Sequence, residues 1–77
     1  MALITDAATT WSAPVTLTAD EVWQTRAGSV FLTTTDSPAV DDGIALTERS
    51  AVQLAAGRVV RYRKEGAAAA VIVREAV

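Results

Sequence analysis

The sequence predicts an all-β domain, a small antiparallel β-sandwich or barrel of about seven short strands. Turn signals recur at short, even intervals along the chain. The segments between them are rich in Val, Thr and aromatic residues, which favour extended backbone. Short strands at a spacing of about 8–12 residues are typical of small sandwiches and barrels. With 77 residues, the chain is expected to form a single β domain over residues 1–77.

Each expected strand lies between two turn signals. Turns are expected at residues 12–14, 27–28, 36–43, 56–57 and 65–66, where Gly, Pro, Ser and Asp gather. Residues 1–13 precede the first expected strand and are predicted to form an extended or flexible N-terminal arm. The expected strands are residues 15–18, 21–25, 29–35, 43–46, 51–54, 58–64 and 67–75.

Helix is the alternative at two places. Thr18 and Glu21 have the spacing of a capping box, and Gly28 could end a helix that began there. Residues 47–56 are rich in helix formers and are followed by Gly57. Both segments are only about ten residues long, and neither carries a full apolar stripe. Strands are therefore favoured at both places, with strand or helix left open for residues 47–56.

The expected strand at residues 58–64 carries a basic cluster. Alternation of side chains puts Val60 and Tyr62 on one face and Arg61 and Arg63 on the other. The apolar face is expected to point into a core, and the arginine face to meet solvent or a partner. If Glu65 and Gly66 form a two-residue hairpin loop, this strand pairs with the strand that follows it.

The interior is expected to be shallow. Hydrophobic residues make up 51% of the chain, but sixteen of them are Ala. The chain has neither Cys nor His, so it has no disulfide and no histidine metal ligand to stabilise so small a domain. Packing against other copies of itself is the remaining way to bury more surface. The expected core anchors are Trp23, Phe31, Tyr62 and Ile72.

Charge is divided unevenly along the chain. Residues 1–42 carry six acidic side chains against one Arg, a balance of −5, and residues 43–77 carry six basic side chains against three acidic ones, a balance of +3. Unlike surfaces suit contacts between copies, with Arg61 and Arg63 of one copy facing acids such as Asp41 and Asp42 of the next. The alternative is that these charges pair within one monomer.

Three other kinds of function are disfavoured. Nucleic-acid binding would require a wider basic surface than the cluster at 58–64, on a chain whose net charge is −2. The loop at 36–43 contains three Asp that could offer oxygen ligands to Ca²⁺, but it lacks the spacing of an EF-hand. No Ser has a His to activate it, and no carboxylate pair stands out. We therefore expect no metal, no cofactor and no enzymatic activity.

Trp11 is a candidate contact residue, because it lies in the polar stretch TTWS ahead of the first expected strand. An exposed Trp between small polar residues is typical of an interface anchor or of a sugar-stacking platform. The alternative is that Trp11 folds back and caps one end of the sandwich. The candidate interface comprises Trp11, Arg61, Arg63, Asp41 and Asp42.

Five segments carry a resemblance to a known class of proteins. They are GSVFL at 28–32, DGIAL at 42–46, AVQL at 51–54, AG at 56–57 and VVRYR at 59–63. Over about residues 15–64, this succession of strands and turns resembles small β-rich structural proteins of tailed phages and prophage-like particles. Such sequences usually have a Pro-Gly or Gly-Asp turn after the GIxL strand, whereas this chain has TERS at 47–50.

The resemblance implies a non-enzymatic structural protein of a virion or phage-like particle, such as a head decoration, a connector accessory, or a tail or fibre component. It implies a protein made in the bacterial cytoplasm that forms homo-oligomers and docks on other particle proteins. The alternative is a small carbohydrate-binding module that stacks a sugar on Trp11 or Trp23. No apolar segment reaches the ~18 residues of a membrane span, and no cationic flank of a secretory signal is present, so no membrane partner is expected.

Overall fold

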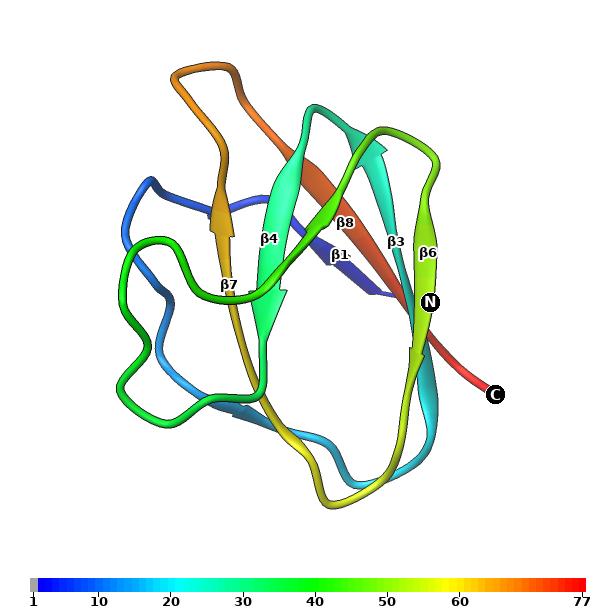
Figure 1. Ribbon diagram of the computed structural model, residues 1–77. Helices are drawn as coiled ribbons and strands as arrows, with labels where there is room; N and C mark the ends of the chain where they lie inside the picture. Colours follow the sequence, from blue (N-terminus) through cyan, green and yellow to red (C-terminus); the bar gives the residue numbers. More distant parts are fainter. Residues whose placement is uncertain (1) are drawn as a thin grey trace.

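The computed structural model describes residues 2–77 and contains two antiparallel four-stranded sheets that face each other as a β-sandwich (Figure 1). One sheet has the strand order β1-β8-β3-β6, and the other has the order β2-β7-β4-β5. This confirms the all-β class and selects the sandwich over the barrel. The strands are β1 (Ala2–Ile4), β2 (Val15–Thr16), β3 (Glu21–Ala27), β4 (Val30–Thr33), β5 (Ile44–Leu46), β6 (Ala51–Leu54), β7 (Val59–Lys64) and β8 (Val71–Ala76).

Most connections cross from one sheet to the other. Among the described strands, β4 and β5 are the one consecutive pair that lies in the same sheet. The remaining pairings join strands that are distant in sequence, such as β1 with β8, β3 with β8 and β4 with β7. The fold therefore depends on long-range pairing, which local turn signals do not specify.

The predicted hairpin between residues 58–64 and 67–75 is wrong. Strand β7 lies between β2 and β4 in one sheet, whereas β8 lies between β1 and β3 in the other. The alanines at 67–70 are not part of a strand, because the chain uses residues 65–70 to pass from one sheet to the other (Figure 1). Four alanines have little side-chain volume and no β-branch, so they suit this connection better than a sheet.

Residues 47–56 form a turn and then strand β6, not a helix. The amides of Arg49 and Ser50 bond the carbonyl oxygens of Thr25 (2.7 Å) and Thr47 (2.9 Å), while the Thr25 amide bonds the carbonyl of Ser50 (3.0 Å). Arg49 and Ser50 thus both oppose Thr25 of β3, and Arg49, the first of the two, has φ of 72°. This is the geometry of a β-bulge with a left-handed first residue. The other candidate helix is also a strand, β3.

Residues 2–13, most of the segment expected to be an arm, lie against the sandwich. Strand β1 pairs with β8, with Leu3 opposite Val73. Further along, the carbonyl of Ala8 accepts a hydrogen bond from the Lys64 amide (2.8 Å), and the amide of Ser12 donates one to the Tyr62 carbonyl (2.9 Å). Met1 lies outside the described residues.

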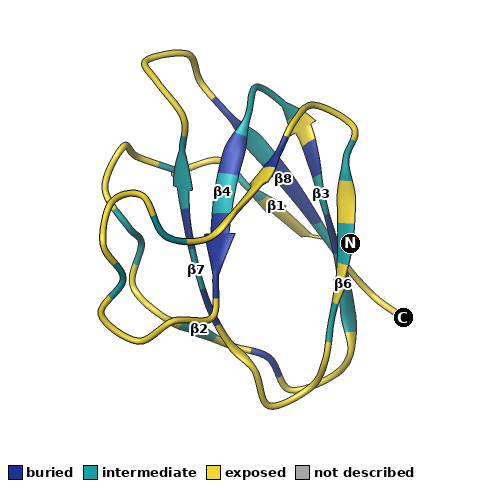
Figure 2. Ribbon diagram, viewed as in Figure 1, coloured by how far each residue is buried: buried dark blue, intermediate teal, exposed yellow. Residues whose placement is uncertain are grey.

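The core lies between the sheets (Figure 2). Of the four expected anchors, Trp23, Tyr62 and Ile72 are buried there. Phe31 is not a core residue, and that expectation is corrected. It lies between Val30 and Leu32, which both point inward, so alternation along β4 places its ring on the outer face. The buried hydrophobic core consists of Leu17, Trp23, Val30, Leu32, Leu46, Val60, Tyr62, Ala70 and Ile72.

Candidate functional site

The arginine face of β7 is the first candidate site. Val60 and Tyr62 are buried, whereas Arg61 and Arg63 lie on the outer face of the sheet. The Arg63 guanidinium lies over two aromatic rings, 4.2 Å from the centroid of Phe31 and 5.2 Å from that of Trp11. Phe31 is directly opposite Arg63 on β4, so strand register alone brings this cation to the ring.

Trp11 is held by the loop between β4 and β5. Its indole N–H donates a 2.7 Å hydrogen bond to the carbonyl of Ala39, and the Arg63 guanidinium donates one to the carbonyl of Val40. Trp11 is half-buried as a result. Its position is closest to the alternative in which it folds back on its own chain, although it covers the outer face of a sheet rather than an end of the sandwich.

The acidic residues of this loop act within the loop and against β7. One carboxylate oxygen of Asp42 accepts a 2.8 Å hydrogen bond from the Ala39 amide, which closes the turn. Asp36 forms a 3.4 Å ion pair with Arg61, and Asp41 is exposed. Within residues 2–77, no cluster of three or more acidic, His or Cys side chains is arranged to hold a metal ion.

The predicted interface residues therefore make much of their contact within the chain. Trp11, Arg63 and Arg61 are brought together on one face, and Asp42 lies in the loop that covers them. The ion pairs Arg61–Asp36 and Arg74–Glu21 each join the basic half of the sequence to the acidic half. For Arg61 and Arg74, the structure therefore has the alternative arrangement, in which the charges pair within one monomer.

A polar network closes one end of the core. Glu21 accepts two hydrogen bonds from Arg74, at 2.9 and 3.0 Å, and one from the indole N–H of Trp23 at 2.9 Å. The hydrogen bonds from Arg74 hold the pKa of Glu21 below its usual value. The Tyr62 hydroxyl donates a 2.7 Å hydrogen bond to Asp6, and burial, followed by this bond, raises the pKa of Tyr62 to about 12. These groups orient core side chains, so we assign them a structural role.

Trp23 cannot act as a sugar-stacking platform, because it is fully buried (0% exposed). The Arg74 guanidinium lies 5.0 Å from its ring centroid, and the Tyr62 ring packs against it at 6.3 Å between centroids. Of the two tryptophans, Trp11 alone has an exposed part, and Arg63 already covers one region of its ring.

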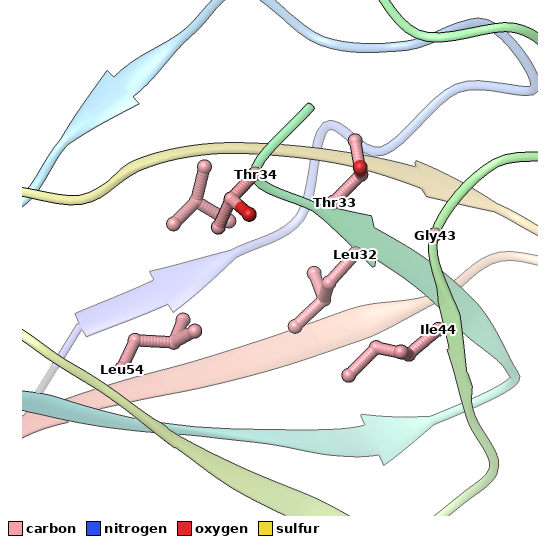
Figure 3. Close-up of a pocket in the computed structure, with 7 residues that line it drawn as sticks. Leu32, Thr33, Thr34, Gly43, Ile44 and Leu54 are labelled. Carbon is pink, nitrogen blue, oxygen red and sulfur yellow. The ribbon is translucent and has the colours of Figure 1, made fainter. Parts of the chain in front are cut away.

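The second candidate site is an apolar groove on the open side of the sandwich, between β5 and β6 (Figure 3). Leu32, Ile44 and Leu54 reach it from three different strands, and Val60 also lines it. Ile44 is opposite Leu32 on the inward face of its sheet, yet it is 50% exposed. The sequence predicts the strand here but not the exposure of Ile44, because that exposure depends on how far apart the edges of the two sheets lie.

The size and chemistry of the groove limit what it can bind. Its volume is about 150 Å³, below the roughly 300–1,000 Å³ of small-molecule sites. Its polar lining comes from Thr33 and Thr34, and no charged side chain lines it. A space of this kind suits a single apolar side chain from another protein.

Comparison with known proteins finds no match for this chain among family models, curated proteins or solved structures. Residues 2–77 contain no helix that could span a membrane.

Proposed function

We propose that this protein is a non-enzymatic structural module that acts by binding other protein subunits, beginning with copies of itself. The observation that carries the proposal is the open side of the sandwich. Ile44 points toward the core but is half exposed, and the groove beside it leads to Leu32 and Val60. Association that buries an inward-facing apolar side chain now exposed to water would gain the free energy of removing that apolar surface from water.

The proposed setting is a phage or phage-like particle, where this chain serves as a decoration, connector accessory, or tail or fibre component. The support for this setting is the sequence resemblance over about residues 15–64. A compact module with a radius of gyration of 11.2 Å and an unclosed apolar side suits repeated placement on a larger assembly. The test is whether the protein stays with intact particles through a density gradient. Its presence in the free fraction alone would contradict the setting.

Replacing Ile44 tests the binding side. Ile44→Ser is expected to weaken self-association while the variant stays folded, because a half-exposed side chain contributes less to the monomer than a core one. The measurement is light scattering on a size-exclusion column over a range of protein concentrations, with circular dichroism to establish folding.

The matched control is Val40→Ser. Val40 is also an exposed aliphatic residue (67%), but it does not line the groove. Equal association of both variants and the unmodified chain would contradict a role for the groove. Binding of a polysaccharide with quenching of Trp11 fluorescence would favour the carbohydrate alternative instead.

A further inference from the structure

Strand β4 stops short of one end of β7 and leaves an edge of β7 uncovered. The last pair between these strands is Thr33 opposite Arg61, although β7 begins at Val59. If β4 continued, Thr35 would lie opposite Val59. Instead, the Thr35 amide bonds the Thr33 hydroxyl (3.0 Å), and the Thr35 carbonyl accepts a hydrogen bond from the Arg61 side chain (3.2 Å). The Arg61 side chain lies on the outer face, so Thr35 is held toward that face and away from the edge of β7.

The hydrogen bonds of β7 show that the N–H and C=O of Val59 point to this uncovered edge. In an antiparallel pair, alternate residues direct both groups at the same neighbour. The carbonyl of Arg58 accepts a 2.9 Å bond from the Leu17 amide, on the β2 side. The carbonyl of Tyr62 accepts a 2.9 Å bond from the Ser12 amide, on the same side. Val59 therefore faces the β4 side, where no other strand of residues 2–77 pairs with it.

Two spaces of different chemistry adjoin this edge, and Thr34 lines both. On the inner side is the apolar groove, which Val60 also lines. On the outer side is a hollow of about 320 Å³, here called the arginine hollow, which is lined by Thr34, Asp36, Gly57, Arg58, Val59 and Arg61. Arg58 is exposed and forms no ion pair within residues 2–77. The two arginines give the arginine hollow a net positive charge, since Asp36 is the one acidic residue that lines it.

We propose that an extended segment of a partner protein adds beside β7 at Val59, with an acidic side chain in the arginine hollow and an adjacent apolar side chain in the apolar groove. The inference rests on the proposed function, since it names the chemistry of the partner that the open side binds. The free N–H and C=O of Val59 suit a peptide backbone, which offers one acceptor and one donor at each residue.

The alternation of side chains along a strand fits both spaces at once. The partner residue opposite Val59 lies on the outer face, as Val59 does, and so reaches Arg58 and Arg61. The residue next to it in the partner points inward, to the groove lined by Ile44 and Leu54. The groove volume of about 150 Å³ suits one apolar side chain.

The experiment titrates a synthetic peptide, acetyl-Thr-Thr-Val-Glu-Val-Thr-Thr-amide, into dilute isotope-labelled protein at low salt, because exposed charge contacts are screened as salt rises. A Val on each side of the Glu allows either strand direction. The Val59 amide and the methyl groups of Ile44 and Leu54 are expected to shift together in NMR spectra, with one dissociation constant. A peptide with Lys in place of Glu is expected to bind about tenfold more weakly. A peptide with Ser in place of both Val is expected not to bind at millimolar concentration.

Charge reversal in the protein tests the same contact from the other side. Arg58→Glu is expected to raise the dissociation constant of the Glu peptide about fivefold and to lower that of the Lys peptide. Arg26→Glu is the matched control. Arg26 is also exposed, but it lies on β3 in the other sheet and lines neither space. It is expected to leave the preference for the Glu peptide in place, and circular dichroism establishes that both variants are folded.

The outcomes separate this inference from the proposed function. Shifts at Ile44 and Leu54 without one at Val59 would show that the peptide enters the groove without adding to β7, which would overturn the inference. Equal binding of the Glu and Lys peptides would overturn it as well. No shift at millimolar Glu peptide would also overturn it, while self-association sensitive to Ile44→Ser would leave the proposed function standing. Peptide binding as expected by a chain that stays monomeric would support the inference and contradict self-association.

Discussion

Trp23→Ala is expected to remove most of the free energy of unfolding of the chain at 25 °C. Trp23 is fully buried in the core, and its indole N–H bonds Glu21. Truncation of a buried Trp costs about 3–5 kcal/mol. At roughly 0.05–0.15 kcal/mol per residue, a chain of 77 residues has a free energy of unfolding of about 4–12 kcal/mol. A small domain lies toward the lower part of that range, so this one change removes most of its stability.

Urea denaturation followed by far-ultraviolet circular dichroism measures this effect. The control is Trp11→Ala, which removes the same side chain from a half-buried position on the outer face. Its loss is expected to cost about 1–2 kcal/mol, because the ring contacts Arg63 and bonds Ala39 but does not fill the core. A larger loss of stability in Trp11→Ala than in Trp23→Ala would contradict the assignment of Trp23 as the core anchor.

Gly43→Ala is expected to be the second most damaging change. Gly43 has φ of 96°, a backbone conformation that disfavours any residue with a Cβ. A Cβ at this position would lie 2.5 Å from the carbonyl oxygen of Leu32 and 3.1 Å from the Trp11 ring. The backbone contact cannot be relieved by a side-chain rotation, so β5 must shift away from β4 or the loop over Trp11 must open. We expect a loss of about 2–4 kcal/mol.

Gly57→Ala is the matched control for Gly43→Ala. Gly57 also has a positive φ, 85°, but a Cβ there would contact nothing within 4 Å. Its cost is therefore conformational alone, about 1–2 kcal/mol. Thermal unfolding of both variants, with Trp fluorescence to follow the displaced Trp11, separates the two effects. Equal melting temperatures for the two variants would show that the close approach of Gly43 to Leu32 does not contribute.

The strands could be predicted from the sequence because their signals are local. Glycines and polar clusters end the strands, and alternation along 59–63 places Val60 and Tyr62 inside and the arginines outside. Strand β1 was not predicted. It is three residues long, and its partner, β8, lies some seventy positions further along the chain. Nothing in so short a segment distinguishes a paired edge strand from an extended arm.

The arrangement of strands could not be predicted, because several sandwiches can be built from the same local pattern. The turn at 65–66 has the composition of a hairpin, yet β7 and β8 belong to different sheets. The position of Phe31 could not be predicted for the same reason. Phe31 was expected in the core, but its neighbours on β4 point inward, so its ring lies on the outer face under Arg63. The apolar groove likewise could not be predicted, because it depends on the distance between the edges of the two sheets. The local sequence around Ile44 and Leu54 does not determine that distance.

Hydrogen exchange at single amides of β6 tests most directly whether a second copy covers the β6 edge, which borders the open side of the sandwich. The amides of Ala51 and Gln53 point to the free edge, whereas those of Val52 and Leu54 bond β3 and serve as internal references. Exchange at Ala51 and Gln53 is expected to be fast in dilute protein and slow in concentrated protein, with Val52 and Leu54 slow in both. Fast exchange at Ala51 and Gln53 at every concentration would contradict binding of a second copy over the β6 edge.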